Sequence, residues 1–235
     1  MSDHWEIQIK ASPQTIETAG HALEANGAHV LSSDGDTHIL ELSTTPASDS
    51  YEIALREAKA LVACLNWITK QILRTGPVAL VDLYKRAADG HRVFYEQLSD
   101  SMALSDRISA QENAENLIQG PPLPLSEWIR LGTTDSVAAK LFRLLSKPSQ
   151  DWPDLYRIFE IIVADAGGKS SVVSRQWATG RSLDRFKHTA NSPGATGDSA
   201  RHGVDQFQAP LDPMTLSEAK SLINSLVQQW LWSKT

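Results

Sequence analysis

The stretch Trp5-Glu-Ile-Gln-Ile-Lys-Ala-Ser-Pro13 contains the pattern that decides the fold class. Apolar and polar residues alternate from Trp5 to Ile9, which is the period of a strand with one buried face. Ser12 and Pro13 are typical of a helix start, because serine caps the first turn and proline fits the first helical position. The chain is therefore predicted to pass from a strand directly into a helix.

Strand and helix patterns continue to alternate up to about residue 109. Asp34-Gly35 predicts a hairpin turn between two short strands. The longest helix is expected over residues 51–74, with its apolar side chains close to one face. Two further strands are expected at residues 77–84 and 92–98. This order, β-α-β-β-α-β-β, predicts an α+β unit with mainly antiparallel strands.

A stiff break follows at Gln119-Gly-Pro-Pro-Leu-Pro124, and the strand period disappears after it. Helices are expected beyond the break at residues 125–131, 134–145, 152–166, 170–179, 183–189 and 216–232. Residues 190–213 are expected to form a long loop, a feature that is often functional. The sequence thus predicts an α+β unit over residues 1–109, a linker over 110–124 and an all-α helical bundle over 125–235.

Composition limits the class of protein. The 235 residues are 41% hydrophobic and 21% charged, as in ordinary globular domains. No run of 18 apolar residues occurs, which predicts no membrane span. The N-terminus lacks a basic segment and an apolar core, so we expect no secretory signal and a cytoplasmic protein. The single cysteine, Cys64, can form no internal disulfide and is expected to be a small buried side chain.

The sequence indicates no cofactor. One cysteine excludes zinc and iron–sulfur sites built on cysteine, and the seven histidines never fall into HxH or HxxxH spacing. Gly-Lys-Ser at 168–170 lacks the glycine that a phosphate loop needs five residues earlier. We therefore expect neither a metal nor a nucleotide cofactor.

The segment from Lys169 to His202 is the most distinctive part of the chain chemically. It holds six Lys and Arg but two acids, a balance of +4, whereas the whole chain carries −6. A basic segment with two histidines on an acidic protein suits a phosphate-bearing ligand. The residues that we expect to bind nucleic acid there are Arg175, Arg185, Lys187, Asn191, Arg201 and His202.

Two residues of this segment are candidates for catalysis. Arg181 and His188 are seven residues apart, so they share a face if the surrounding helix begins early enough. An arginine holds a phosphate bidentately, and a histidine can take a proton from a ribose 2′-hydroxyl or return one to a leaving 5′-oxygen. Asp184 lies four residues before His188 and is a candidate to orient its imidazole.

The helical second half, with an arginine followed by a histidine, resembles the HEPN domains, which are small helical bundles. Many HEPN proteins are ribonucleases of toxin, RNA-processing and phage-defence systems. The resemblance implies that Arg181 and His188 from two protomers meet at a homodimer interface and cut RNA without metal. It covers residues 125–235. Ser182 follows the arginine here, where the family's motif has Asn, Asp or His.

Two hypotheses of function remain open from the sequence. The first is a HEPN-type endoribonuclease, with residues 1–109 sensing a trigger or binding a regulatory protein partner. The second is a non-catalytic scaffold whose basic segment docks a nucleic acid or an acidic partner. In the second hypothesis, His188 and its basic neighbours form an ordinary solvated helix face, and Asn191 serves the turn before Ser192-Pro193.

Overall fold

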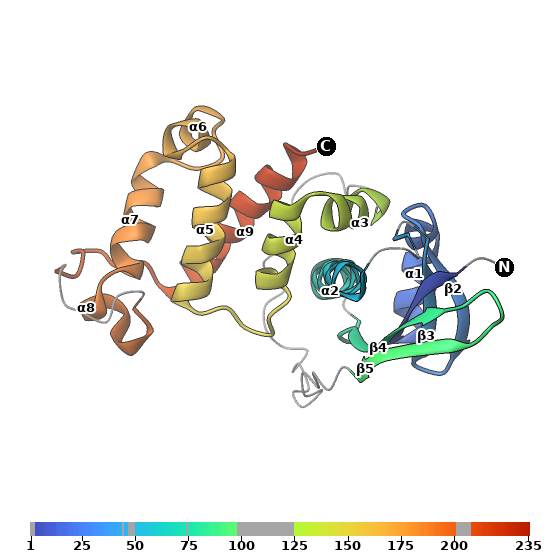
Figure 1. The fold of residues 1–235 in the computed structure, drawn as a ribbon. Coiled ribbons are helices and arrows are strands. Elements are labelled where there is room, and N and C mark those ends of the chain that lie inside the picture. The colour runs from blue at the N-terminus through green and yellow to red at the C-terminus, as the bar shows by residue number, and fades with distance from the viewer. Residues whose placement is uncertain (1–2, 44, 47–49, 74, 98–124, 201–207) are drawn as a thin grey trace. The chain divides into compact units, whose positions relative to one another are not determined.

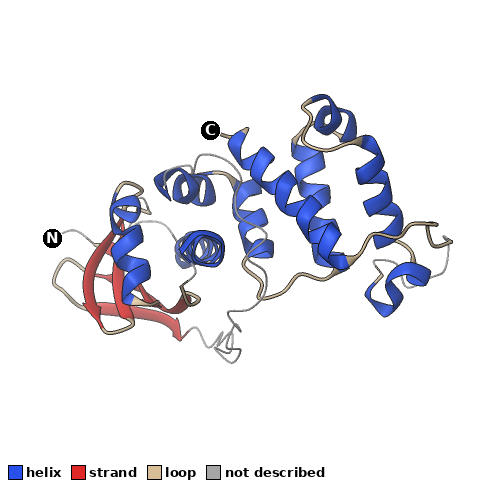
Figure 2. Cartoon of the chain, turned by 180° about the vertical axis from the view of Figure 1, so that it is seen from behind, coloured by secondary structure: helices blue, strands red, loops and turns tan. Residues whose placement is uncertain are grey.

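The structure is a computed structural model that describes residues 3–43, 45–46, 50–73, 75–97, 125–200 and 208–235. The described residues form two compact units. The first takes in those up to Gln97 together with residues 125–146, and the second runs from Lys147 to Thr235. Figure 2 shows strands in the first unit alone, and the described residues after Gln97 contain helices but no strand. The predicted α+β class is confirmed.

An antiparallel sheet forms the base of the first unit. Its strands are β1 (His4–Lys10), β2 (Ala28–Asp34), β3 (Thr37–Leu42), β4 (Ala79–Arg86) and β5 (Arg92–Gln97). They lie in the order β2-β3-β1-β4-β5, and every neighbouring pair is antiparallel. The hairpin turn between β2 and β3 contains Gly35 with a φ of +57°, as the Asp-Gly pair predicts.

The alternation that opens the chain produces the buried face of this sheet. Ile7 of β1 lies opposite Leu40 of β3 and Leu83 of β4, and all three side chains are fully buried. Helix α1 (Pro13–Glu24) begins where the sequence predicts, because the Ser12 hydroxyl accepts a hydrogen bond from the backbone N–H of Thr15. Helix α2 (Tyr51–Ile68) continues into a π-helical turn, Thr69–Leu73.

The division of the chain differs from the one that the sequence predicts. Helices α3 (Leu125–Thr134) and α4 (Ser136–Leu145) pack on α2 and belong to the first unit, not to the C-terminal bundle (Figure 1). Trp67 of α2 meets Trp128 of α3 at a ring-centroid distance of 4.7 Å and Phe142 of α4 at 5.1 Å. These aromatic contacts bury the apolar faces of α3 and α4 against the α+β unit.

Cys64 of α2 and Gly132 of α3 lie close together where the two helices pack. Cys64 is fully buried, as expected, and its thiol donates to the Trp128 carbonyl oxygen at 3.2 Å. Burial raises the pKa of this thiol. A Cβ atom on Gly132 would lie 2.8 Å from the Cys64 Cβ and 3.0 Å from its sulfur. The glycine is therefore needed for the two helices to pack.

The second unit is helical in its described residues. It contains α5 (Trp152–Asp165), α6 (Lys169–Ser174), α7 (Gly180–Ala190), α8 (Pro193–Thr196), a 3-10 turn (Gly197–Ser199) and α9 (Leu216–Trp232). Helix α5 contacts α6, α7 and α9. Its aromatic side chains surround Phe186 of α7, with ring centroids 6.2 Å away at Trp152, 6.1 Å at Tyr156 and 5.3 Å at Phe159.

Helices α6 and α7 of the second unit differ in length from the prediction. Helix α6 ends at Ser174, because Arg175 caps it and Gln176 then takes a φ of +60°. Helix α7 begins at Gly180, three residues earlier than expected, because the Thr179 hydroxyl accepts from the backbone N–H of Ser182. Arg181 is therefore inside the helix.

We predict that Gly132→Ala destabilises the first unit while Gly20→Ala does not. Alanine favours a helix interior over glycine by about 0.5–1 kcal/mol, but overpacking a core costs about 1–3 kcal/mol. Gly20 lies within α1 and has no atom within 4 Å of an added Cβ, so only the favourable effect applies there. Urea unfolding of the two variants measures the difference. Equal stability of both variants would contradict the close approach at Cys64.

Candidate functional site

Helix α7 presents the predicted catalytic residues on its solvent side. Leu183, Phe186 and Ala190 are fully buried and hold one face of the helix in the core of the second unit. Arg181 and His188 lie on the opposite side and are exposed. The early start of α7 puts them two helical turns apart on one face, as the sequence hypothesis requires.

Two adjoining hollows lie along this exposed side. The larger, of about 540 Å³, is lined by Arg181, Asp184, Arg185, His188, Pro210 and Asp212. The smaller, of about 320 Å³, is lined by Asp184, Lys187, His188 and Asn191. Asp184 and His188 line both, so they stand at the boundary between the hollows. Arg181 and His188 are brought together in the larger one.

The backbone of the following segment orients the His188 imidazole. His188 Nε2 lies 2.8 Å from the carbonyl oxygen of Gln208. A carbonyl oxygen only accepts, so Nε2 carries the proton and donates it to this bond. In the neutral ring, the lone pair is then on Nδ1, which is the atom able to accept a proton. The orienting role that the sequence suggested for Asp184 falls instead to Gln208.

The Asp184 carboxylate forms an ion pair with Lys169 and makes no contact with His188 that would orient its ring. Its Oδ1 lies 2.5 Å from the ammonium nitrogen of Lys169, which begins α6. This ion pair links α6 to α7 across the surface and neutralises one charge of the basic segment. One oxygen of the carboxylate at the boundary of the hollows is thus already bound.

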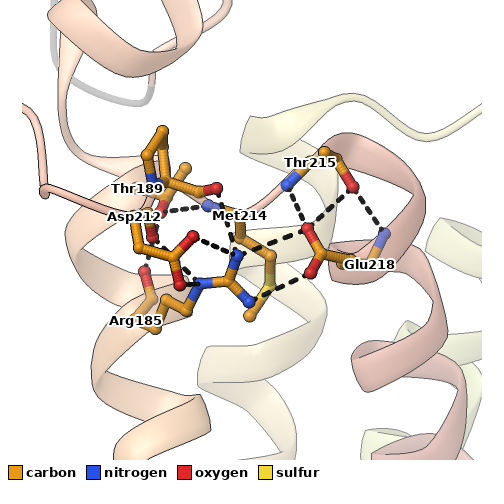
Figure 3. A network of polar contacts seen from close by, with 7 residues as sticks. Arg185, Thr189, Asp212, Met214, Thr215 and Glu218 are labelled. Atoms are coloured by element: carbon orange, nitrogen blue, oxygen red, sulfur yellow. Dashed lines mark hydrogen bonds and ion pairs between the residues drawn. The ribbon is translucent and has the colours of Figure 1, made fainter.

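Arg185 was predicted to bind nucleic acid, but its guanidinium is held by protein groups (Figure 3). Nε donates to the carbonyl oxygen of Asp212 at 2.9 Å and lies 3.1 Å from its carboxylate. Nη1 donates to Glu218 at 3.0 Å, and Nη2 donates to the Pro213 carbonyl oxygen at 3.2 Å. Arg185 therefore connects α7 to the segment before α9 and to α9 itself.

Thr189 adds a further connection between α7 and this segment. Its hydroxyl oxygen accepts from the backbone N–H of Met214 at 3.0 Å and donates to the Arg185 carbonyl oxygen at 2.9 Å. We refer to residues 208–214 as the strap. Contacts from His188, Arg185 and Thr189 fasten it along α7, and its Pro210 and Asp212 form a wall of the larger hollow. Sequence reasoning missed the strap, because its partners on α7 are distant in the chain.

Glu218 completes the network at the start of α9. It forms a reciprocal capping box with Thr215: the Thr215 N–H donates to Glu218 at 2.7 Å, and the Glu218 N–H donates to the Thr215 hydroxyl at 3.2 Å. The backbone N–H of Thr215, then its hydroxyl, then Arg185 lower the pKa of Glu218 to about 2. This carboxylate stays charged through the neutral and mildly acidic range.

The remaining predicted residues divide into three groups. The side chains of Arg181 and Lys187 are exposed and have no ion-pair or hydrogen-bond partner among the described residues. Arg175 stacks over the Trp177 ring at 5.1 Å and lines neither hollow. Arg201 and His202 lie outside the described residues. The cations at the hollows that are open to a ligand are thus Arg181 and Lys187.

Asn191 caps the C-terminal end of α7 and lines the smaller hollow. Its Nδ2 lies 3.5 Å from the Tyr156 hydroxyl, at the far limit of a hydrogen bond. Its Oδ1 is buried and has no hydrogen-bond partner among the described residues. Buried carbonyl oxygens are rarely left in this state.

Comparison with known proteins gives no relative: no family model, no curated protein and no solved structure matches the chain. Within the described ranges, no helix is long and apolar enough to cross a membrane. The same residues include no group of three or more His, Cys, Asp or Glu that could hold a metal ion.

We predict that Arg185→Ala lowers the melting temperature of the second unit by several degrees, whereas Arg181→Ala leaves it nearly unchanged. Arg185 connects α7 to the strap and to α9, and its removal leaves Asp212 and Glu218 without their cation. Arg181 stands on the same helix without such partners, so it is a matched control. Thermal unfolding followed by circular dichroism compares the two. Equal melting temperatures would show that the network does not stabilise this unit.

We also predict that acid weakens the network within a defined range of pH. The pKa of Glu218 falls from its ordinary 4.5 to about 2, so its contribution is present above pH 4.5 and is lost as the pH falls toward 2. Glu218→Gln should therefore be less stable than the parent near neutral pH. The difference between their free energies of unfolding should decrease as the pH falls from about 4.5 to 2. Urea unfolding at several pH values measures it. A difference in the free energy of unfolding that does not change with pH would contradict the lowered pKa of Glu218.

Proposed function

We propose that the second unit is a metal-independent endoribonuclease of HEPN type, in which Arg181 holds the scissile phosphate and His188 transfers a proton. The observation that carries this proposal is that Arg181 and His188 line the same open hollow. The guanidinium of Arg181 is exposed and has no protein partner among the described residues, so it is available to a phosphate. The imidazole of His188 is exposed and already oriented by Gln208.

The reaction that fits these groups is an internal transfer of the phosphodiester. His188 Nδ1 takes the proton of the ribose 2′-hydroxyl, and the 2′-oxygen attacks phosphorus. The bond from phosphorus to the 5′-oxygen breaks, and the departing oxygen takes a proton from water. Arg181 neutralises the charge that develops on the phosphoryl oxygens. The products are a 2′,3′-cyclic phosphate and a 5′-hydroxyl, and the imidazolium returns its proton to solvent.

The other basic residues of the segment bind the RNA backbone. Lys187, Arg175, Arg201 and His202 are assigned to this role. Arg185 is assigned a different one, because its guanidinium positions the strap, and the strap orients His188. The electrostatic attraction of RNA thus depends on fewer cations at the hollows than the sequence suggests.

The resemblance to HEPN domains adds two elements to the proposal. The enzyme works as a homodimer in which Arg181 and His188 of two copies face each other. The first unit then restrains or triggers the activity by binding a protein partner. Both elements rest on the resemblance and on the position of the two residues on an exposed helix face.

The alternative function is a binding module without catalysis. One observation argues against a scissile phosphate at Arg181: the carboxylates of Asp184 and Asp212 line the same hollow and repel it, so a nucleic acid would then be bound by basic residues outside this hollow. The two functions differ in a simple outcome, since a binding module retains RNA unchanged and an endoribonuclease releases shorter products.

We predict that the full chain cleaves labelled RNA in the presence of EDTA and that His188→Ala lowers the rate by about 10²–10⁴-fold. Arg181→Ala should lose activity to a similar extent, because the phosphate is then neither positioned nor stabilised. Arg181→Lys should recover only part, since an ammonium does not reproduce the bidentate fork. Gel analysis of the products, with identification of the cyclic phosphate, is the measurement.

The double variant Arg181→Ala/His188→Ala serves as the test of joint action. Residues that act as one unit are strongly non-additive, so it should be little slower than either single variant. All variants should stay close to the parent's thermal stability, because both side chains are exposed and the one contact removed, from His188 Nε2 to the Gln208 carbonyl oxygen, is a single surface hydrogen bond. Full activity of His188→Ala would end the catalytic assignment, and tight binding without cleavage would establish the binding module.

A further inference from the structure

The loop between α6 and α7 carries a cation and an aromatic ring side by side. The guanidinium carbon of Arg175 lies over the Trp177 ring, 5.1 Å from its centroid. We propose that this pair is a stacking platform, a second RNA-binding site that takes one unpaired base close to the phosphate at Arg181. The proposal rests on the proposed function, because it needs RNA at the exposed side of α7.

Both side chains of the platform are accessible to a ligand. Arg175 is exposed, as are the other residues from Val173 to Gln176, and Trp177 is half-buried. Within the part of the chain that the structure describes, the Arg175 guanidinium has no ion-pair or hydrogen-bond partner, and the Trp177 indole nitrogen has no acceptor. A ligand therefore reaches an uncompensated guanidinium directly, together with the open part of the ring beside it.

The backbone holds this pair in place before any ligand binds. Gln176 takes a φ of +60°, a left-handed conformation that residues other than glycine rarely adopt. Its N–H donates to the Val173 carbonyl oxygen at 3.0 Å, and the next N–H, of Trp177, donates to Val172 at 3.1 Å. These two bonds form a Schellman motif, which ends α6 and fixes the backbone on both sides of Gln176. Groups that are already fixed lose less conformational entropy when they bind.

The platform is close in the chain to the residue that holds the scissile phosphate. Only residues 178–180 separate Trp177 from Arg181, so their Cα atoms are at most about 14 Å apart, at about 3.6 Å per residue. The Thr179 hydroxyl accepts from the Ser182 N–H and starts α7 directly after the loop. A base on the platform and a phosphate at Arg181 can thus belong to one short stretch of RNA.

Cations without an acidic partner continue from the platform along α7. Among the described residues, Arg175, Arg181 and Lys187 form no ion pair, whereas Lys169 is paired with Asp184. A basic track beside an aromatic side chain suits a single strand, because the phosphates meet the cations and the bases stack on the ring and the guanidinium. The bases of a duplex are already stacked on one another, so a duplex would meet the cations alone.

Probes that cannot be cleaved measure this binding apart from catalysis. A labelled 2′-O-methyl oligonucleotide without self-complementary sequence lacks the 2′-hydroxyl nucleophile, and it is compared with its own duplex by fluorescence anisotropy with the full chain. The single strand should bind at least about tenfold more tightly. Trp177→Leu keeps an apolar side chain but removes the ring, so it should weaken single-strand binding by about 5- to 150-fold and leave duplex binding unchanged.

Two further variants control for the loss of a large side chain. Trp177→Phe keeps an aromatic face and should retain part of the affinity that Trp177→Leu loses. Trp232→Leu is the matched control, because Trp232 ends α9 in the same unit, is also half-buried and lies outside the basic segment. It should bind the single strand as the parent does. Circular dichroism melting of the three variants checks that each is folded.

Salt dependence and fluorescence distinguish stacking from charge. Trp177→Leu should leave the slope of log affinity against log salt unchanged, whereas Lys187→Ala should reduce it by about 0.7, the effect of one lost phosphate contact on a single strand. A base stacked on Trp177 quenches its emission, so saturation with the single strand should quench the parent more than Trp177→Phe. This last comparison remains decisive if Trp177→Leu does not fold.

The outcomes separate the platform from the catalytic proposal. Equal binding of single strand and duplex by the parent would overturn the platform even if the chain cleaves RNA, and so would single-strand binding or quenching that does not depend on Trp177. A single-strand preference that depends on Trp177 in a chain that cleaves no RNA would support the platform and overturn the ribonuclease. A parent that binds neither probe would overturn the platform, while the cleavage assay judges the ribonuclease separately.

Discussion

Arg185 connects three separate parts of the second unit through its guanidinium, and the candidate site depends on these contacts. It begins on α7, donates to the backbone and carboxylate of the strap at Asp212, and reaches Glu218 in the first turn of α9. The planar fork of an arginine is suited to this task, because it offers several donors in fixed directions. The strap that it holds provides the Gln208 carbonyl, which orients His188.

Ion pairs within the protein also reduce the number of cations of the basic segment that can bind a ligand. Lys169 pairs with Asp184, and Arg185 pairs with Asp212 and Glu218, so both cations stabilise the fold. Arg181 and Lys187 are left facing the hollows. With two of its cations paired in this way, the basic segment presents a few cations at the hollows, in contrast to the broad positive surface that binds DNA without regard to sequence.

A cluster of polar side chains lies on β1, the central strand of the first unit, and these side chains bind one another. Glu6 of β1 is fully buried, and Arg86 of β4 binds it through two nitrogens. Burial alone would raise the pKa of Glu6, but hydrogen bonds from Arg86, Tyr84 and His4 outweigh it and hold the pKa below its ordinary value. The cluster fastens β4 to β1, and we assign it a structural role.

The sequence by itself determined the kind and order of the strands and longer helices, because strand and helix periods and their caps are local, whereas the short helix α8 lies in residues expected to form a loop. The strand from Trp5, the cap at Ser12 and the helix at residues 216–232 are present as predicted. The tertiary structure alone decided that α3 and α4 join the first unit. The hydrophobic period of a helix shows which of its faces is buried, but it does not show which element covers that face. The tertiary structure also decided which cations are free: Arg185 meets partners 27 and 33 residues away, and Lys169 meets one 15 residues away. Charge compensation over such separations depends on packing, which no local pattern encodes.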